Sequence, residues 1–208
     1  MASAEPKPEP EPRVPAQLTP PRVRAPLTKS ILAEVDDLPE TQREAVYDAV
    51  PETVAEIRDA ARMAWIQLPT QLALVQATRT VLGSDAAYEN FCAKQLGKSV
   101  AIPLVRPIFQ AALRLFGAQP SAVLGLFSRT WSMLTVNVAT ITIPKVVDSE
   151  GTVIRVAGIP KIKHADALVV GFAGTFRGIL ELFDRPGSVE LVDFDPSTGD
   201  AAYLMRWE

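Results

Sequence analysis

Apolar residues recur at three- and four-residue steps from about Thr28 to Leu134, the spacing of helices that bury one face. Proline or a capping serine precedes most of these stretches, and glycine or proline follows them, as at typical helix ends. The first half of the chain is therefore predicted to be helical. The expected helices open at Pro39, Pro51, Ser84, Pro107 and Pro120.

Two boundaries within this helical half depend on single residues. The helix that opens at Pro51 carries Trp65 on its apolar face and is expected to break at Pro69, after which the apolar pattern resumes. Gly97 is expected to end the helix that Ser84 caps, because glycine commonly terminates helices.

The pattern changes after Leu134, where β-branched residues begin to alternate with others. The expected elements are strands over 138–143 and 152–156 with a turn over 148–151, a helix over 164–184, and strands over 189–194 and 201–207. The sequence thus predicts an α+β fold, in which an N-terminal helical half precedes a β-β-α-β-β unit. We expect its sheet to be antiparallel, with the long helix laid on it.

The long helix contains a glycine-rich stretch, 171–178, which invites comparison with a phosphate-binding loop. The stretch matches neither G-x-x-x-x-G-K-[ST] nor G-x-G-x-x-G. Its small residues instead follow one side of the helix, beside the apolar stripe; they are Ala167, Gly171, Gly174 and Gly178. Because glycine is costly inside a helix, we interpret this strip as a surface for close packing.

Residues 1–26 hold eight of the eighteen prolines, several of them alternating with charged residues. Proline fixes φ and removes a hydrogen-bond donor, so this segment is predicted to be a disordered tail. Residues 27–208 are predicted to form a single α+β domain. We find neither a secretory signal nor an apolar stretch long enough to cross a membrane, and so expect a cytoplasmic protein.

Composition and charge exclude several function classes. The 208 residues include 21 basic and 24 acidic side chains, and the formal net charge of −3 does not favour nucleic-acid binding. The one cysteine, Cys92, allows no internal disulfide, and together with the one histidine, His164, it is too few for a zinc site. The mean hydropathy of +0.13 indicates a generous core or an apolar face that a partner covers.

No group of residues has the pattern of a catalytic site. His164 is the only ordinary general base near neutral pH, and no G-x-S-x-G motif supplies it with a nucleophile. Cys92 lies on an apolar helix face and is interpreted as a small buried hydrophobe. Asp193, Asp195 and Asp200 match a calcium loop poorly and favour a hairpin turn. We therefore expect no enzymatic activity, no metal and no cofactor.

Aromatic side chains are the remaining candidates for contact with a ligand. Most aromatic residues at helical spacing fill cores. If this chain has a ligand pocket, the residues expected to line it are Trp65, Trp131, Phe172, Phe176 and Arg177.

Between Leu27 and Trp207 several short motifs stand at characteristic spacing. They are Trp65 with Pro69, Leu96-Gly97, Arg114-Leu115-Phe116-Gly117 with Pro120, Arg129 with Trp131, Gly158-Ile159-Pro160, Gly171 with Gly178, and Tyr203-Leu204-Met205-Arg206-Trp207. In these motifs the chain resembles an uncharacterised paralogous family of myxobacterial proteins of similar length, a domain of unknown function. The order of elements is also similar to the vinyl-reductase, haem–nitric-oxide-binding and TRAPP-type folds, whose members bind small ligands or partner subunits.

The resemblance to the haem–nitric-oxide-binding fold does not extend to its haem residues. That branch needs a Tyr-x-Ser-x-Arg motif and an axial histidine, whereas Met205 stands two places after Tyr203, and His164 opens the long helix. The cysteine-rich signature of the vinyl-reductase branch is absent too. The resemblance therefore implies neither haem nor metal.

Two functions stay open on this evidence. The first is a non-enzymatic protein-interaction or oligomerisation module, favoured by the high apolar content, the lack of catalytic groups and the predicted tail. The alternative is a sensor of small apolar molecules, with a pocket between the helices and the sheet. The first implies a protein partner or self-association, and the second a small ligand.

Overall fold

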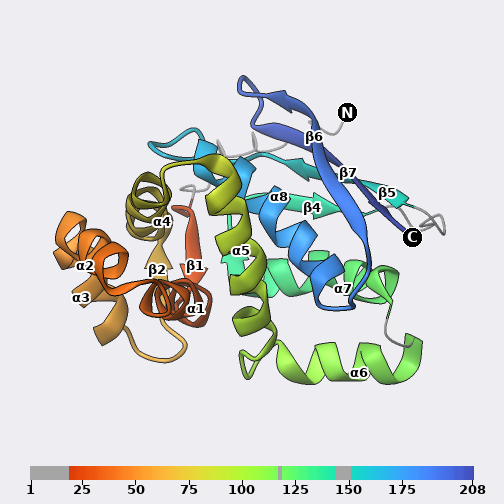
Figure 1. Cartoon of the computed structure of the whole chain (residues 1–208), viewed down its shortest axis with the longest axis horizontal. Coiled ribbons are helices and arrows are strands. Elements are labelled where there is room, and N and C mark those ends of the chain that lie inside the picture. Colours follow the sequence, from red (N-terminus) through yellow and green to blue (C-terminus); the bar gives the residue numbers. More distant parts are fainter. Residues whose placement is uncertain (1–18, 117–118, 144–150) are drawn as a thin grey trace, which may run out of the picture.

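A computed structural model describes residues 19–116, 119–143 and 151–208, and the α+β class is confirmed in it. Figure 1 shows helices gathered on one side of the molecule and a larger antiparallel sheet on the other. The helices are α1 (Ala25–Asp36), α2 (Glu40–Ala49), α3 (Pro51–Asp59), α4 (Leu68–Leu82), α5 (Asp85–Val100), α6 (Arg106–Phe116), α7 (Pro120–Leu134) and α8 (Asp166–Glu181). In these residues, no helix has the length and apolar character needed to span a membrane.

The predicted β-β-α-β-β unit forms the larger sheet and the helix that covers it. Its strands are β4 (Thr140–Thr142), β5 (Gly151–Ala157), β6 (Gly187–Asp195) and β7 (Asp200–Trp207). They pair antiparallel in the order β4-β5-β7-β6, as expected from two hairpins flanking a long helix. Of the turn expected over 148–151, residues 148–150 lie outside the described residues.

A second, smaller sheet was not predicted. It contains β1 (Arg22–Arg24), β2 (Trp65–Gln67) and β3 (Thr135–Val136), in the order β2-β1-β3. β1 and the first two residues of α1 lie within the segment that the sequence assigns to the tail. Pro26 fits there because the first helical turn needs no donor from the backbone nitrogen. Residues 1–18 of the predicted tail lie outside the described residues.

The prediction of one helix from Pro51 to Leu68 was wrong. α3 ends at Asp59, and Trp65 lies on strand β2 rather than on a helical face. Pro69 does not break a helix but stands in the first turn of α4, where proline costs no intrahelical hydrogen bond.

Two other boundaries also differ from the sequence prediction. Gly97 lies inside α5, which continues to Val100. The strand expected over 138–143 is shorter, since β4 covers only Thr140–Thr142, and Asn137 just before it has a left-handed backbone with φ of 56°. The predicted cap at Ser84 is confirmed, since its hydroxyl accepts a hydrogen bond of 3.2 Å from the amide of Ala87.

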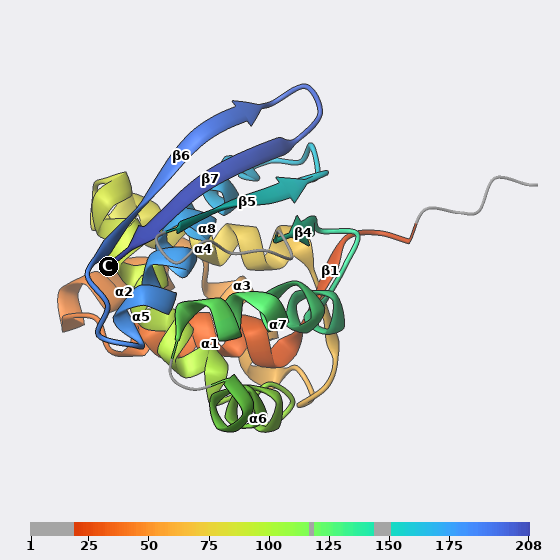
Figure 2. The same cartoon turned by 90° about the vertical axis from the view of Figure 1, so that its right-hand side faces the viewer.

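Helix α8 lies between the sheet and α5 (Figure 2), whereas α7 contacts strand β4 directly. One side of α8 contacts β6 and β7, where the Tyr203 hydroxyl donates a buried hydrogen bond of 2.8 Å to the Val169 carbonyl. Ala201, Tyr203 and Met205, at alternate positions of β7, are buried.

The opposite side of α8 packs closely against α5 through its glycines. A Cβ atom on Gly174 would lie 2.3 Å from the carbonyl oxygen of Glu89 and 2.8 Å from the Cβ of Cys92. A Cβ on Gly178 would lie 2.6 Å from the carbonyl oxygen of Ala93. α8 is a continuous helix here, so the interpretation of the strip as a packing surface is confirmed and the phosphate loop is excluded.

This contact gives a prediction with a matched control. Gly174→Ala should lower the free energy of unfolding by about 1–3 kcal/mol or more, because the new methyl group has no space against the α5 backbone. Gly97→Ala should instead raise it by about 0.5–1 kcal/mol, since Gly97 is exposed inside α5 and nothing lies within 4 Å of the added Cβ. Chemical denaturation of both variants measures the difference. Equal effects of the two substitutions would contradict close packing of α5 and α8.

Candidate ligand cavity

A cavity of about 130 Å³ lies among the helices, on the side of α8 that faces away from the sheet. The residues that line it come from α1, α4, α5, α6, α7 and α8, with Val105 from the turn before α6. None of these lining residues lies on a described strand. The cavity is therefore one layer further from the sheet than the sequence predicts, with α8 in between.

Aromatic rings fill the space in which the sequence places the pocket. The ring of Phe176 is fully buried and lies edge-to-face against Tyr203, with centroids 5.3 Å apart. Phe172 stacks beside Phe176 at 6.0 Å, and Phe127 meets Phe176 edge-to-face at 5.6 Å. These contacts join α7, α8 and β7 into a solid core and leave the open volume on the α5 side of α8.

Two of the five predicted pocket residues line the cavity. The rings of Trp131 and Phe172 meet edge-to-face with centroids 5.2 Å apart, and both residues belong to the cavity wall. The indole nitrogen of Trp131 donates a hydrogen bond of 3.0 Å to the Ala139 carbonyl, which fixes the ring at the entry to β4. Helical spacing was the signal that identified both residues.

The other three predicted residues are not among those that line the cavity. Phe176 lies in the aromatic core behind Phe172. Trp65 lies in the small sheet, where the guanidinium carbons of Arg22 and Arg24 stand 4.8 and 3.8 Å from its ring centre.

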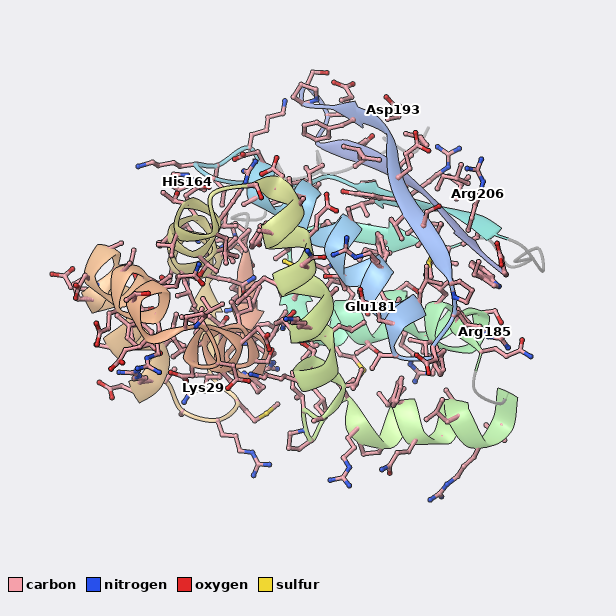
Figure 3. The ribbon with its side chains drawn as sticks, viewed as in Figure 1. Lys29, His164, Glu181, Arg185, Asp193 and Arg206 are labelled. Carbon is pink, nitrogen blue, oxygen red and sulfur yellow. The ribbon has the colours of Figure 1, made fainter. Side chains whose placement is uncertain are left out.

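Arg177, the fifth predicted residue, bridges α8 and α5. Its guanidinium pairs with Glu89 at 3.7 Å and with Glu181 at 3.4 Å, and it donates a hydrogen bond to Asn90. Figure 3 shows Glu181 on the last part of α8.

Most of the wall is aliphatic or aromatic, and it carries no histidine, lysine, arginine, aspartate or glutamate among the residues that the structure describes. Its polar groups are few. Gln71 and Gln95 are both buried and lie on α4 and α5, and Ser99 follows Gln95 by one helical turn. The sequence analysis did not single out these glutamines, because an amide on a helix is more often exposed than buried.

Tyr88 and Cys92 lie on one turn of α5 against Gly171 of α8. A Cβ on Gly171 would come 3.3 Å from the Tyr88 hydroxyl and 3.6 Å from the Cys92 sulfur. Burial raises the pKa of the Cys92 thiol to about 12, although its hydrogen bond with Tyr88 acts in the opposite direction. Burial likewise raises the pKa of the Tyr88 phenol well above its ordinary value. Both groups are therefore neutral at physiological pH.

His164 and the acidic hairpin lie apart from the cavity. His164 precedes α8 with a left-handed backbone, φ of 67°, at the periphery of the molecule (Figure 3). The Asp195 carboxylate accepts a hydrogen bond of 2.7 Å from the Ser197 amide, as in a turn closed by its own side chain. Within the described ranges, no group of three or more His, Cys, Asp and Glu side chains is placed to hold a metal ion.

The fold is similar to that of solved H-NOX domains. An oxygen-binding H-NOX domain related to soluble guanylate cyclases aligns with a TM-score of 0.62 and 12% identity, over 89% of this chain and 94% of that chain. An H-NOX mutant from T. Tengcongensis aligns with a TM-score of 0.63 and 10% identity, over 89% of this chain and 97% of that chain. A structure from work on haem distortion in the H-NOX family aligns with a TM-score of 0.64 and 12% identity, over 89% of this chain and 94% of that chain.

At this level of identity the likeness shows the fold alone, and it confirms the predicted similarity to haem–nitric-oxide-binding domains at that level. No protein-family model matches the sequence, and no curated protein matches it. The resemblance to the myxobacterial family therefore stays a prediction.

The raised thiol pKa predicts low reactivity of Cys92. In the folded protein, the thiol should react with a disulfide reagent such as DTNB far more slowly than a free cysteine at mildly alkaline pH, because the thiolate is the nucleophile. In denaturant the same residue should react completely and at once. Rapid labelling of the native protein would contradict the burial of Cys92 at the cavity wall.

Proposed function

We propose that this domain binds small apolar molecules in the cavity between α8 and the helical half, and that it acts as a ligand-sensing domain. The observation that supports this most is the apolar cavity itself, lined by Trp131 and Phe172. In another protein, an engineered apolar cavity of about 150 Å³ stays dry and binds benzene or xenon. A volume of about 130 Å³ is of the same order.

The arrangement of the wall suits a sensor because its helices belong to different parts of the domain. α6 contributes Ile108 and Phe109 to the cavity, and the Phe109 ring stacks at 6.5 Å on Phe183 just beyond α8. A bound ligand touches both helices, so it favours one arrangement of α6 against α8. A ligand shifts a conformational equilibrium through such differential contacts.

The solved H-NOX domains raise the question of haem, and the residues of this cavity do not fit it. Haem iron takes an axial histidine, methionine, cysteinate or tyrosinate. The described wall has no histidine or methionine, and burial keeps Cys92 and Tyr88 neutral. No lysine or arginine in the described wall is placed to pair with propionates, and the volume suits one aromatic ring rather than a macrocycle. We therefore propose a haem-free domain.

Titration with haemin tests this part of the proposal. Haemin added to the purified protein should show no stoichiometric shift of the Soret band, because the cavity offers neither an axial ligand nor enough volume. Bovine serum albumin is a suitable positive control for the measurement. A saturable Soret shift at one haem per chain would contradict the proposal.

Toluene provides the direct test of apolar binding. At a concentration 100-fold above its dissociation constant, it should raise the free energy of unfolding by about 2.7 kcal/mol, seen as a higher melting temperature. Val123→Phe should abolish this shift, since Val123 is buried on α7 and the larger ring would occupy the cavity.

Val192→Phe is the matched control, because Val192 is 48% exposed on β6 and far from the cavity wall. It should keep the full response to toluene. Equal stabilisation of the Val123→Phe variant by toluene would place binding elsewhere and contradict the proposal.

The interaction module stays a prediction, and one surface supports it. β6 is an edge strand of nine residues (Figure 1). It exposes the apolar side chains of Leu191, Val192 and Phe194. Open edges of this kind pair with further strands. Glu190 and Asp193 on the same strand oppose pairing between two copies.

A further inference from the structure

Two buried side-chain amides give the cavity a polar end. Gln71 on α4 is 4% exposed and Gln95 on α5 is 8% exposed, and both line the cavity. Both are held from α1, by Thr28 and Ser30 respectively. Thr28 and Ser30 lie between the two α1 residues that line the cavity, Leu27 and Ile31.

Hydrogen bonds hold each amide in place. The Thr28 hydroxyl donates to Oε1 of Gln71 at 2.9 Å. Nε2 of Gln95 donates to the hydroxyls of Ser30 at 2.7 Å and Ser99 at 2.6 Å. The Ser30 hydroxyl itself donates to the Leu27 carbonyl, so it accepts from Gln95, which places the nitrogen of that amide toward the serines.

One polar atom of each side-chain amide has no hydrogen bond to the described residues. Among the described residues, Nε2 of Gln71 has no acceptor and Oε1 of Gln95 has no donor. Neither atom is among the fully buried, unpartnered side-chain atoms of the described residues, so each keeps some accessible surface at which a further group can bind. The two unused atoms belong to residues that line the same cavity, one as a donor and one as an acceptor.

We infer that the ligand is a small neutral amphiphile: an apolar body with a head that accepts a hydrogen bond from Gln71 and donates one to Gln95, as an alcohol or a primary amide does. This inference rests on the proposed function and adds the head group to it. The absence of ionisable side chains other than Tyr88 and Cys92 from the described wall disfavours a charged head, which would lack a counter-charge.

Three probes of similar shape separate the two hydrogen bonds. Benzyl alcohol has a donor and an acceptor, benzaldehyde has an acceptor only, and toluene has neither. Gln71→Met should weaken the binding of benzyl alcohol and of benzaldehyde, each on the order of fivefold, and leave toluene binding unchanged or tighter. Gln95→Met should weaken only benzyl alcohol, by a similar factor. Gln76→Met, outside the cavity wall on α4, should change none of the three affinities.

The outcomes distinguish this inference from the proposed function. If toluene binds but neither glutamine variant discriminates among the probes, the inference is overturned and the apolar cavity stands. An equal loss of all three affinities would assign the glutamines a packing role only and also overturn it. If no probe binds the unmodified protein, the proposed function fails together with the inference.

A measurement on the unmodified protein covers the case in which a variant does not fold. In an NMR titration, the side-chain amide protons of Gln71 should move further downfield with benzyl alcohol and with benzaldehyde than with toluene, because all three rings shift nearby protons but only the first two probes accept a hydrogen bond. Identical shifts with all three probes would contradict the hydrogen bond from Gln71 to the ligand head.

Discussion

The close contact between α5 and α8 is the constraint on which the rest of the structure depends. Two glycines of α8 bring its backbone against that of α5, with no space for a side chain at Gly174 or Gly178. This contact joins the helical half to the sheet, because the other side of α8 packs against β6 and β7. A side chain at either position would force the backbones of α5 and α8 to move apart.

The same contact determines where the cavity lies. α8 turns its large aromatic side chains, above all Phe176, toward β7 and α7, where they fill the core. It turns its small residues toward α5, and the part of that side beyond the tight contact is left as open volume beside Gly171 and Cys92. The pocket is thus bounded by helices and by the turn before α6 among the described residues, and α8 forms its wall toward the sheet.

Much of the fold could be predicted from the sequence, because it depends on patterns that local physics imposes. The change from helical to alternating period identified the β-β-α-β-β unit, and the cost of glycine inside a helix identified the packing strip of α8. The small sheet could not be predicted, since β1, β2 and β3 are short and are stabilised by pairing between distant segments. Pro69 was misinterpreted because proline both breaks helices and opens them, and only tertiary structure decides between the two.

The candidate site was harder to predict from the sequence than the fold. Trp131 and Phe172 follow from helical spacing, but the same spacing also selects Phe176, which lies in the filled core. Gln71 and Gln95 carry no sequence signal, because their role depends on burial and on hydrogen bonds to α1.

Diffraction from crystals of the protein pressurised with xenon tests the central claim most directly, because xenon occupies apolar cavities without requiring any polar contact. The account predicts a xenon atom in contact with Trp131, Phe172 and Val123, on the α5 side of α8. A solid core at that position, with no xenon bound there, would contradict it.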